Sequence, residues 1–204
     1  MKIGLIVECV QEGPETKVLP ALGALFRDDL SFEIESLGNK PNVLNRCGRS
    51  AKALLDLSKC DRVLVVWDAR PPWKEENVEM DPEKEKQKAL SSLESSGLAN
   101  DPRIRLICIV EELEAWLLAD GRGITARVNQ LRRARPKLKV SITDSKRVET
   151  IEWPKSVMQN LFRKYEVRDY NDWLDAGPIA NAIPEAKRLL KHSKVFPQYQ
   201  DALS

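Results

Sequence analysis

The chain has 204 residues, among them 33 Lys and Arg, 31 Asp and Glu, and a single His. That length is enough to bury the core of one ordinary domain, and a composition of 42% apolar and 31% charged residues excludes a largely disordered chain. No stretch of about 18 apolar residues occurs, so we expect no membrane-spanning helix and no membrane partner.

The N-terminus and the cysteines indicate a cytoplasmic protein. The first residues, MKIGLIVE, become charged too soon for a secretory signal peptide and have the pattern of a strand. The four cysteines lack the CxxC spacing of redox or metal-binding pairs, so we expect reduced thiols. His192 is far in sequence from all of them, which argues against a zinc site.

Charge is distributed unevenly along the chain. Residues 1–120 contain 16 basic and 22 acidic side chains, a net charge of −6, whereas residues 121–170 contain 13 basic and 5 acidic side chains, a net charge of +8. For either part alone, solvated helix faces are the simplest explanation. Together the two parts indicate a cation-binding region followed by a surface that attracts phosphates.

Four short apolar runs predict the strands of a sheet. They are Ile3–Val7, Phe32–Leu37, Arg62–Trp67 and Ile104–Val110. The third and fourth runs are nearly continuous and rich in β-branched residues, which is typical of strands buried on both faces of a parallel sheet. The second run alternates between apolar and polar residues, so we expect it nearer an edge.

Segments with helical spacing lie between these runs. We expect helices from Pro14 to about Phe26, from Pro41 to about Leu55, and over Pro82–Ser96. The alternation of strands and helices predicts an α/β fold, an open and mainly parallel four-stranded sheet with right-handed crossovers and helices on both faces.

The pattern changes beyond residue 120. The elements expected there are a hinge at Gly121–Gly123 and helices over Ile124–Arg135, Pro154–Tyr165 and Ile183–His192. We therefore divide the chain into an α/β core, residues 1–120, and a basic, mainly helical extension, residues 121–204, packed on that core.

Carboxylates follow three of the four predicted strands, at the edge where open parallel sheets bind their ligands. Glu8 and Asp68 end the first and third strands. Glu12 lies four residues after the first strand end, and Glu111, Glu112 and Glu114 follow the fourth strand. Crowded carboxylates repel one another unless a cation is present, and Mg²⁺ or Mn²⁺ prefers carboxylate and water ligands. The pattern predicts a metal or phosphate site.

A purely structural role explains each of these residues when it is taken alone. The acidic residues after the fourth strand open a helix, where the macrodipole favours them without a metal. Glu8 and Asp68 can each cap a turn. Neither a GxxxxGK[ST] P-loop nor a GxGxxG fingerprint occurs, so the sequence indicates no ATP or dinucleotide site.

Several segments resemble the Toprim family. Ile3–Glu8 with Glu12-Gly13-Pro14 is similar to the first Toprim strand and its acidic turn, and Val63–Asp68 is similar to the strand that ends in the Toprim aspartate motif. Leu37–Pro41 and the string ELEAWLLAD resemble a narrower, largely uncharacterised bacterial Toprim-like family. That family is related to overcoming-lysogenization-defect nucleases, and the resemblance covers most of the chain.

The resemblance implies a Toprim/Rossmann-like sheet, Mg²⁺ bound by acidic residues, and the breaking or making of phosphodiester bonds. Related stand-alone Toprim proteins are associated with ATPase partners in phage defence. The sequence departs from the pattern at Cys9, where glycine is usual, and at Asp68-Ala69-Arg70, which lacks the second carboxylate of a DxD pair. Either Glu111, Glu112 or Glu114 supplies the missing ligand, or the protein binds without cleaving.

Our leading hypothesis is a Mg²⁺- or Mn²⁺-dependent phosphodiesterase, specifically a nuclease. The expected metal ligands are Glu8, Asp68, Glu111 and Glu114. The expected catalytic residues are Glu8, Glu12 as a general base, and Arg70 or Lys40 to neutralise charge on the phosphate. The residues expected to track a nucleic-acid backbone are Arg127, Arg132, Arg133, Arg135, Lys137 and Lys139.

Two other hypotheses stay open. The protein is a non-catalytic nucleic-acid-binding or sensor subunit that acts with a partner ATPase, which suits the degenerate aspartate motif. Alternatively, the carboxylates are helix caps and the basic stretch is a solubilising face. The sequence does not decide between DNA and RNA, or whether the protein is a homo-oligomer.

Overall fold

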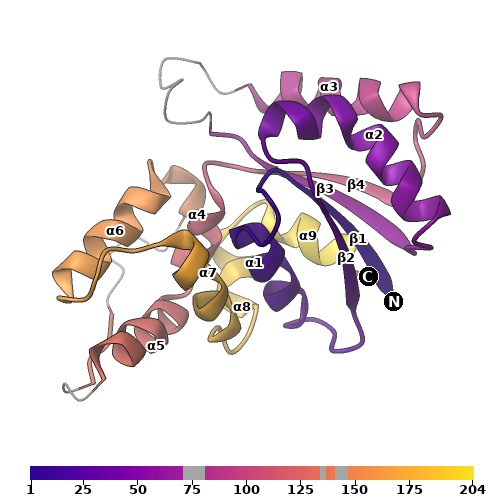
Figure 1. The fold of residues 1–204 in the computed structure, drawn as a ribbon. Coiled ribbons are helices and arrows are strands. Elements are labelled where there is room, and N and C mark those ends of the chain that lie inside the picture. The colour runs from indigo at the N-terminus through magenta and orange to yellow at the C-terminus, as the bar shows by residue number, and fades with distance from the viewer. Residues whose placement is uncertain (71–80, 134–136, 141–146) are drawn as a thin grey trace.

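A four-stranded, all-parallel sheet organises the computed structural model, which describes residues 1–70, 81–133, 137–140 and 147–204. The strand order is β2-β1-β3-β4 (Figure 1). The strands are β1 (Lys2–Val7), β2 (Ser31–Ser36), β3 (Arg62–Asp68) and β4 (Ile104–Ile109). The predicted α/β class, the parallel sheet and the edge position of β2 are confirmed, and β4 forms the other edge.

Helices cover both faces of the sheet. The helices α2 (Lys40–Asp56) and α3 (Pro82–Ser95) lie together on one face, and α1 (Pro14–Gly23) and α9 (Phe196–Ala202) lie on the other (Figure 1). The chain passes from β1 to β2 on one side, then returns past β1 to β3. Right-handed connections in these opposite directions place α1 and α2 on opposite faces.

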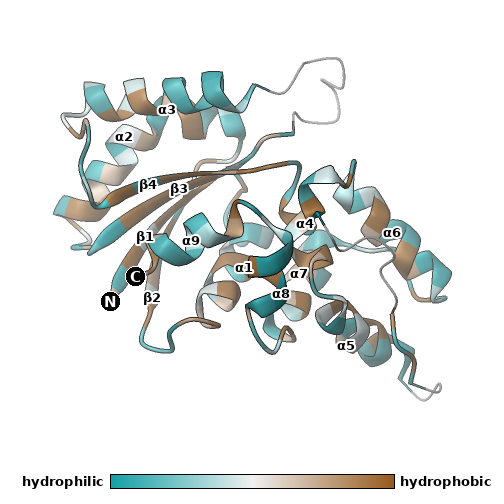
Figure 2. Ribbon diagram, turned by 180° about the vertical axis from the view of Figure 1, so that it is seen from behind, coloured by the Kyte–Doolittle hydropathy of each residue, from teal (hydrophilic) through white to brown (hydrophobic). Residues whose placement is uncertain are grey.

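Strand residues alternate between two buried clusters. In β1, Ile3, Leu5 and Val7 belong to the cluster that contains α1, while Ile6 belongs to the cluster under α2 and α3. In β3 the corresponding sets are Leu64 and Val66, and Val63, Val65 and Trp67. This burial on both faces explains why the central strands are almost continuously apolar, as the brown colour of β3 in Figure 2 illustrates.

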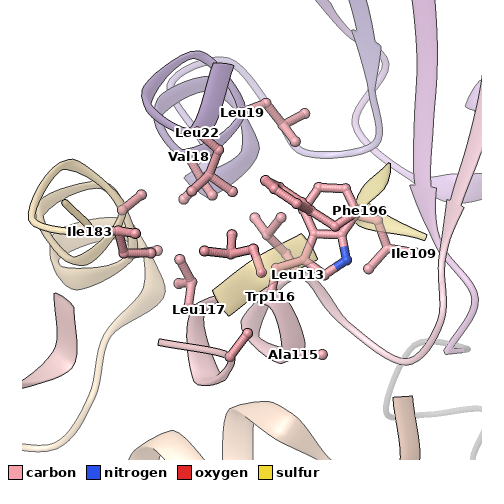
Figure 3. Close-up of a cluster of buried hydrophobic side chains, with 14 of the residues drawn as sticks. Val18, Leu19, Leu22, Ile109, Leu113, Ala115, Trp116, Leu117, Ile183 and Phe196 are labelled. Carbon is pink, nitrogen blue, oxygen red and sulfur yellow. The ribbon is translucent and has the colours of Figure 1, made fainter. Parts of the chain in front are cut away.

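The segment after residue 120 packs into the same cluster as α1. Its helices are α5 (Gly121–Arg132), α6 (Pro154–Lys164), α7 (Asp172–Asn181), α8 (Lys187–His192), α9 and the 3₁₀ turn η2 (Val148–Thr150). The short helix α4 (Leu113–Leu118) joins the two parts, because its Trp116 meets Phe196 edge to face at 5.0 Å between ring centroids. Figure 3 shows Trp116 beside Phe196, in one cluster with Val18 and Leu22 of α1.

Two expectations for this segment are wrong. Gly121–Gly123 is the first turn of α5 rather than a hinge, because the buried Asp120 side chain accepts the backbone N–H of Arg122 at 3.0 Å and caps the helix. The helix expected over Ile183–His192 begins only at Lys187. None of the helices in the described ranges combines the length and apolarity needed to cross a bilayer.

Both ends of the chain lie at the amino edge of the sheet. The guanidinium of Arg62, at the start of β3, donates to the carbonyl oxygens of Ala202 and Ser204 at 3.4 and 3.1 Å. The Met1 amine donates to the Asp29 carbonyl at 3.1 Å, beside the start of β2. Figures 1 and 2 both show the two ends side by side.

Candidate functional site

Glu8 and Asp68 meet at the switch point of the sheet. The connections after β1 and β3 leave toward opposite faces, and such a divergence opens a crevice at the carboxyl ends of the two strands. Glu8 directly follows β1 and Asp68 ends the neighbouring β3. The Asp68 backbone N–H donates to Glu8 Oε1 at 2.9 Å. Two of the expected metal ligands therefore lie together where open α/β sheets bind ligands.

Negative charge crowds around Asp68. Burial raises the pKa of Asp68 well above its ordinary value, and the charges of Glu8, Glu15, Glu114 and Glu112 raise it further. Burial likewise raises the pKa of Glu8 to about 7, although the hydrogen bond from Asp68 opposes this shift. Because the environment disfavours the charged carboxylates, they hold protons or favour a cation near neutral pH.

The start of α4 brings Glu114 into this group. The Leu113 N–H donates to Asp68 Oδ2 at 3.3 Å and so fixes the α4 turn against the end of β3. Glu114 is only 6% exposed, and its Oε1 accepts the Tyr170 hydroxyl at 3.1 Å. Burial, and then the charge of Glu112, raise the pKa of Glu114 to about 7.

Glu111 and Arg70 neutralise each other. Arg70 Nε donates to Glu111 Oε2 at 2.7 Å, and the second guanidinium nitrogen contacts the same oxygen. The guanidinium carbon lies 4.0 Å from the ring centroid of Trp153, in cation–π geometry. Both side chains are largely buried. A metal at Glu111 or a phosphate at Arg70 would have to displace the other member of this pair.

Lys40 and Glu12 occupy very different environments. Lys40 is buried, and its Nζ donates to the Ala69 carbonyl at 2.8 Å and to Glu85 Oε1 at 3.0 Å. Glu85 also accepts Trp67 Nε1 at 2.9 Å. Lys40 thus holds the turn after Asp68 in place from the start of α2. Glu12 is exposed, in a left-handed backbone conformation with φ 65°.

Four residues that the sequence analysis did not assign to the site line it. They are Glu15, Lys155, Tyr170 and Asp172. The Lys155 N–H, at the start of α6, donates to Glu112 Oε2 at 2.9 Å, and its Nζ donates to Asp172 Oδ2 at 2.6 Å. Glu15 could have been found from the sequence, because it follows Pro14 in the first turn of α1, where acidic residues are favoured. Lys155, Tyr170 and Asp172 come from distant segments with no local motif.

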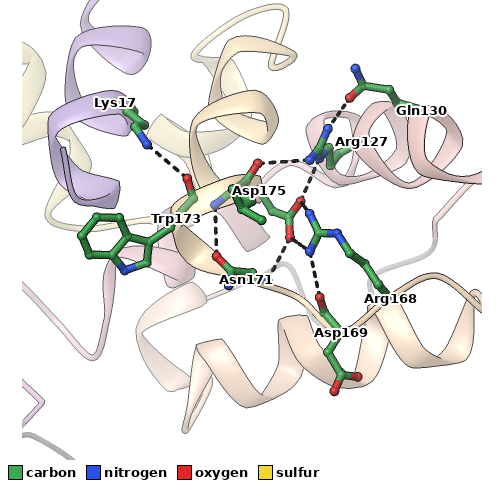
Figure 4. Close-up of polar contacts among 9 residues, drawn as sticks. Lys17, Arg127, Gln130, Arg168, Asp169, Asn171, Trp173 and Asp175 are labelled. Atoms are coloured by element: carbon green, nitrogen blue, oxygen red, sulfur yellow. Dashed lines mark hydrogen bonds and ion pairs between the residues drawn. The ribbon is translucent and has the colours of Figure 1, made fainter.

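The basic residues expected to bind nucleic acid divide into two groups. Arg127 is tied to α7, since its Nε donates to Asp175 Oδ1 at 2.8 Å and Arg168 donates to the same carboxylate (Figure 4). Arg132 donates to the Tyr165 carbonyl at 2.8 Å. By contrast, Arg133, Lys137 and Lys139 are exposed, and Arg135 lies outside the described residues.

The carboxylates suit a divalent cation in chemistry but do not form a ready-made site. Over the ranges that the structure describes, no three Asp, Glu, His or Cys side chains converge into a group that could hold a metal ion. Their oxygens are nevertheless the ligands that a hard cation prefers. Glu15 Oε2 is buried without a hydrogen-bond partner among the described residues. The arrangement fits an ion that draws neighbouring carboxylates together.

Comparison with known proteins gives matches among solved structures. The C-terminal region of the Xanthomonas campestris pv. campestris OLD protein is similar over 98% of this chain and 95% of that chain, with 14% identity and a TM-score of 0.47. The C-terminal region of the Burkholderia pseudomallei OLD protein is similar over 99% and 98%, with 13% identity and a TM-score of 0.45. The likeness is one of fold. No family model and no curated protein matches the chain.

Proposed function

We propose that the protein is a nuclease of Toprim type, a phosphodiesterase that depends on Mg²⁺ or Mn²⁺. The observation that carries the proposal is the meeting of Glu8 and Asp68 at the switch point of the sheet. Further support comes from the neighbouring carboxylates, whose charge raises the pKa of Asp68, and from the Toprim resemblance of the strand-end motifs.

Each residue has a defined role in this proposal. Glu8, Asp68 and Glu114 are the metal ligands, and Glu111 joins them only by leaving Arg70. A bound divalent ion supplies Lewis-acid polarisation of the phosphoryl group and a water of lowered pKa. Glu12, exposed after β1, accepts the proton of the attacking water.

Two basic side chains act on different groups, one on the substrate phosphate and the other on the turn after Asp68. Arg70, once separated from Glu111, neutralises charge on the phosphate, and Lys40 positions Asp68 through the Ala69 carbonyl. A cytoplasmic setting agrees with the four free cysteines. A role in phage defence or DNA processing, with an ATPase partner, follows from the Toprim resemblance and is part of the proposal.

The test is cleavage of labelled DNA and RNA in Mg²⁺, in Mn²⁺ and in EDTA. Wild-type protein cleaves only with the ion, and Asp68→Asn lowers the rate by about 100-fold or more because the ion loses a ligand. Asp56→Asn is the matched control, since Asp56 is exposed at the far end of α2 and its loss leaves the rate unchanged. An inactive wild type, or full activity in Asp68→Asn, contradicts the proposal.

A non-catalytic subunit is the second candidate, and one observation favours it. Arg70 stands at the position of the missing DxD carboxylate. Glu111, one of the candidates to replace that carboxylate, is already paired with Arg70. This candidate predicts binding of nucleic acid or of an ATPase partner that is indifferent to divalent ions, with no turnover in the cleavage assay.

A further inference from the structure

A second surface lined by basic and polar residues lies between α2 and α3, on the face of the sheet opposite α1. The two helices border a cavity of about 700 Å³, whose lining contains only basic, amide and hydroxyl side chains. Arg46 and Arg49 of α2 form one wall, and Lys84 and Lys88 of α3 form the other. We call this surface the α2–α3 groove.

Small residues bring the two helices close together at the floor of the groove. A Cβ atom on Gly48 would lie 2.0 Å from the backbone oxygen of Ser92. The Gly48 N–H also donates to Ser92 Oγ at 3.0 Å. Because no side chain separates the backbones here, the longer basic side chains flank a continuous depression.

The acidic side chains near the groove form no ion pairs with its basic residues in the part of the chain that the structure describes. All four basic side chains are exposed, and within the described residues none takes part in an ion pair or a side-chain hydrogen bond with another residue. Like charges one helical turn apart repel, as for Lys84 and Lys88. Glu85, the acidic residue between them, points its carboxylate to Lys40 and Trp67 instead.

We propose that the α2–α3 groove binds the sugar-phosphate backbone of nucleic acid and guides it to the carboxylate site, which is formed by Glu8, Asp68 and Glu114. The lining contains no aromatic or aliphatic side chain, whereas the buried cores of protein interfaces are enriched in aromatic residues and more apolar than the rest of the surface. Exposed Arg and Lys side chains that flank small polar residues suit a row of phosphates. Contacts with phosphates do not depend on the base sequence. This inference rests on the proposed function, because it supplies the substrate surface of that site.

The groove is connected to the carboxylate site through α3. Lys84 lies next to Glu85, which binds Lys40, and Lys40 in turn holds the carbonyl of Ala69, directly after Asp68. From Lys84 to Ser95 the helix extends about 17 Å, which matches about five phosphates along one strand of B-DNA. The Lys84 end of the groove therefore lies at the same edge of the sheet as Asp68, and a backbone that continues beyond Lys84 approaches the site from the α3 side.

The test is fluorescence anisotropy with a labelled DNA duplex, single-stranded DNA and RNA, in EDTA, between 50 and 200 mM salt. Replacing Arg46, Arg49, Lys84 and Lys88 together by Gln removes about four phosphate contacts. The four contacts account for roughly a 50- to 150-fold fall in wild-type affinity over that salt range, and the variant loses this part of the salt dependence. Lys84→Arg with Lys88→Arg preserves binding, since the charge is kept.

The control carries the same change in net charge elsewhere on the surface. Lys59, Lys187, Lys191 and Lys194 are exposed and lie outside the groove, and their joint replacement by Gln leaves the salt dependence nearly unchanged. A third variant replaces Arg133, Lys137 and Lys139 by Gln. The groove proposal is overturned if either of these variants weakens binding as strongly as the groove variant, or if wild type does not bind.

The use of EDTA separates this proposal from the nuclease proposal. Groove-dependent binding together with an inactive wild type in Mg²⁺ would retain the groove and reject the nuclease. Cleavage that depends on Asp68, together with binding that the groove variant does not alter, would do the reverse.

Discussion

Glu8 and Glu114 have a pKa of about 7 in the folded protein, against an ordinary value of 4.5. Burial is the largest cause for both groups, and the charges of neighbouring carboxylates add to it. Between these two values the folded state keeps protons that the unfolded state has already released. The free energy of unfolding therefore falls as the pH rises from about 4.5 to about 7.

In EDTA, the wild-type protein should unfold at a lower temperature at pH 8 than at pH 5. Asp68→Asn should reduce this difference in midpoint, because it removes one charge from the carboxylates around Glu8 and Glu114. Addition of Mg²⁺ or Mn²⁺ at pH 8 should raise the wild-type midpoint, since an ion bound only to the folded state stabilises it. Thermal melts followed by circular dichroism measure all three effects.

The control and the contradicting result come from the same melts. Asp56→Asn changes an exposed carboxylate away from the site and should keep the wild-type pH dependence. Equal wild-type midpoints at pH 5 and pH 8 would show that the carboxylates carry no shared electrostatic penalty.

The Arg70–Glu111 pair makes a second prediction for single residues. Glu111→Gln leaves a largely buried guanidinium without its counter-charge and should lower the unfolding free energy by about 3 kcal/mol. The double variant Arg70→Met, Glu111→Leu should recover most of this loss, because it removes both charges. Urea unfolding at constant pH distinguishes the two, and equal stability of wild type and Glu111→Gln would be incompatible with the pairing.

Among the elements, α2 and α3 depend on each other through one glycine. A methyl group on Gly48 would collide with the backbone oxygen of Ser92, which cannot rotate away. Gly48→Ala should therefore cost about 1–3 kcal/mol of stability, although alanine is the better helix former. Lys52→Ala, at an exposed position of the same helix, is the control and should change stability by less than about 0.5 kcal/mol. A neutral or stabilising Gly48→Ala in urea unfolding would disprove the close crossing.

Strands and proline-led helices were predictable because their causes are local. β1 and β3 are buried on both faces, which leaves an unbroken apolar run in the sequence. Pro14 and Pro154 stand in the first turns of α1 and α6, as the sequence indicates. By contrast, α7 contains Gly177 and Pro178, so its helical form depends on tertiary packing that local propensity does not reveal.

The sequence predicted those parts of the candidate site whose positions follow from the order and direction of the strands. Glu8 and Asp68 end adjacent parallel strands, so the strand-end rule places them together. Their surroundings depend on side-chain choices that spacing does not encode. Arg70 binds Glu111, and Tyr170 reaches Glu114 from a segment 56 residues later in the chain.

Over the whole molecule, the two segments of the chain share one hydrophobic cluster. Val18 and Leu22 of α1 and Trp116 of α4 pack with Phe196 and the other C-terminal helices (Figure 3). Residues 1–120 without the rest would expose this face of the sheet to water, at a cost of about 25 cal/mol for each Å² of apolar surface.

We therefore expect the fragment 1–120 not to fold alone. Its circular dichroism melt should lack a cooperative transition, whereas the full chain unfolds in one. A cooperative melt of the fragment, with protected amide protons in β1 and β3, would instead establish residues 1–120 as an independent domain.

The contact of Arg62 with the last residues has a practical consequence for experiments. Since both ends emerge at the amino edge of the strands, a linker or fluorophore attached to either one is separated from Glu8 and Asp68 by the length of the sheet. Six residues of parallel strand span about 20 Å. Surface immobilisation or energy-transfer labelling through either end should accordingly leave the opposite rim open to incoming polymers.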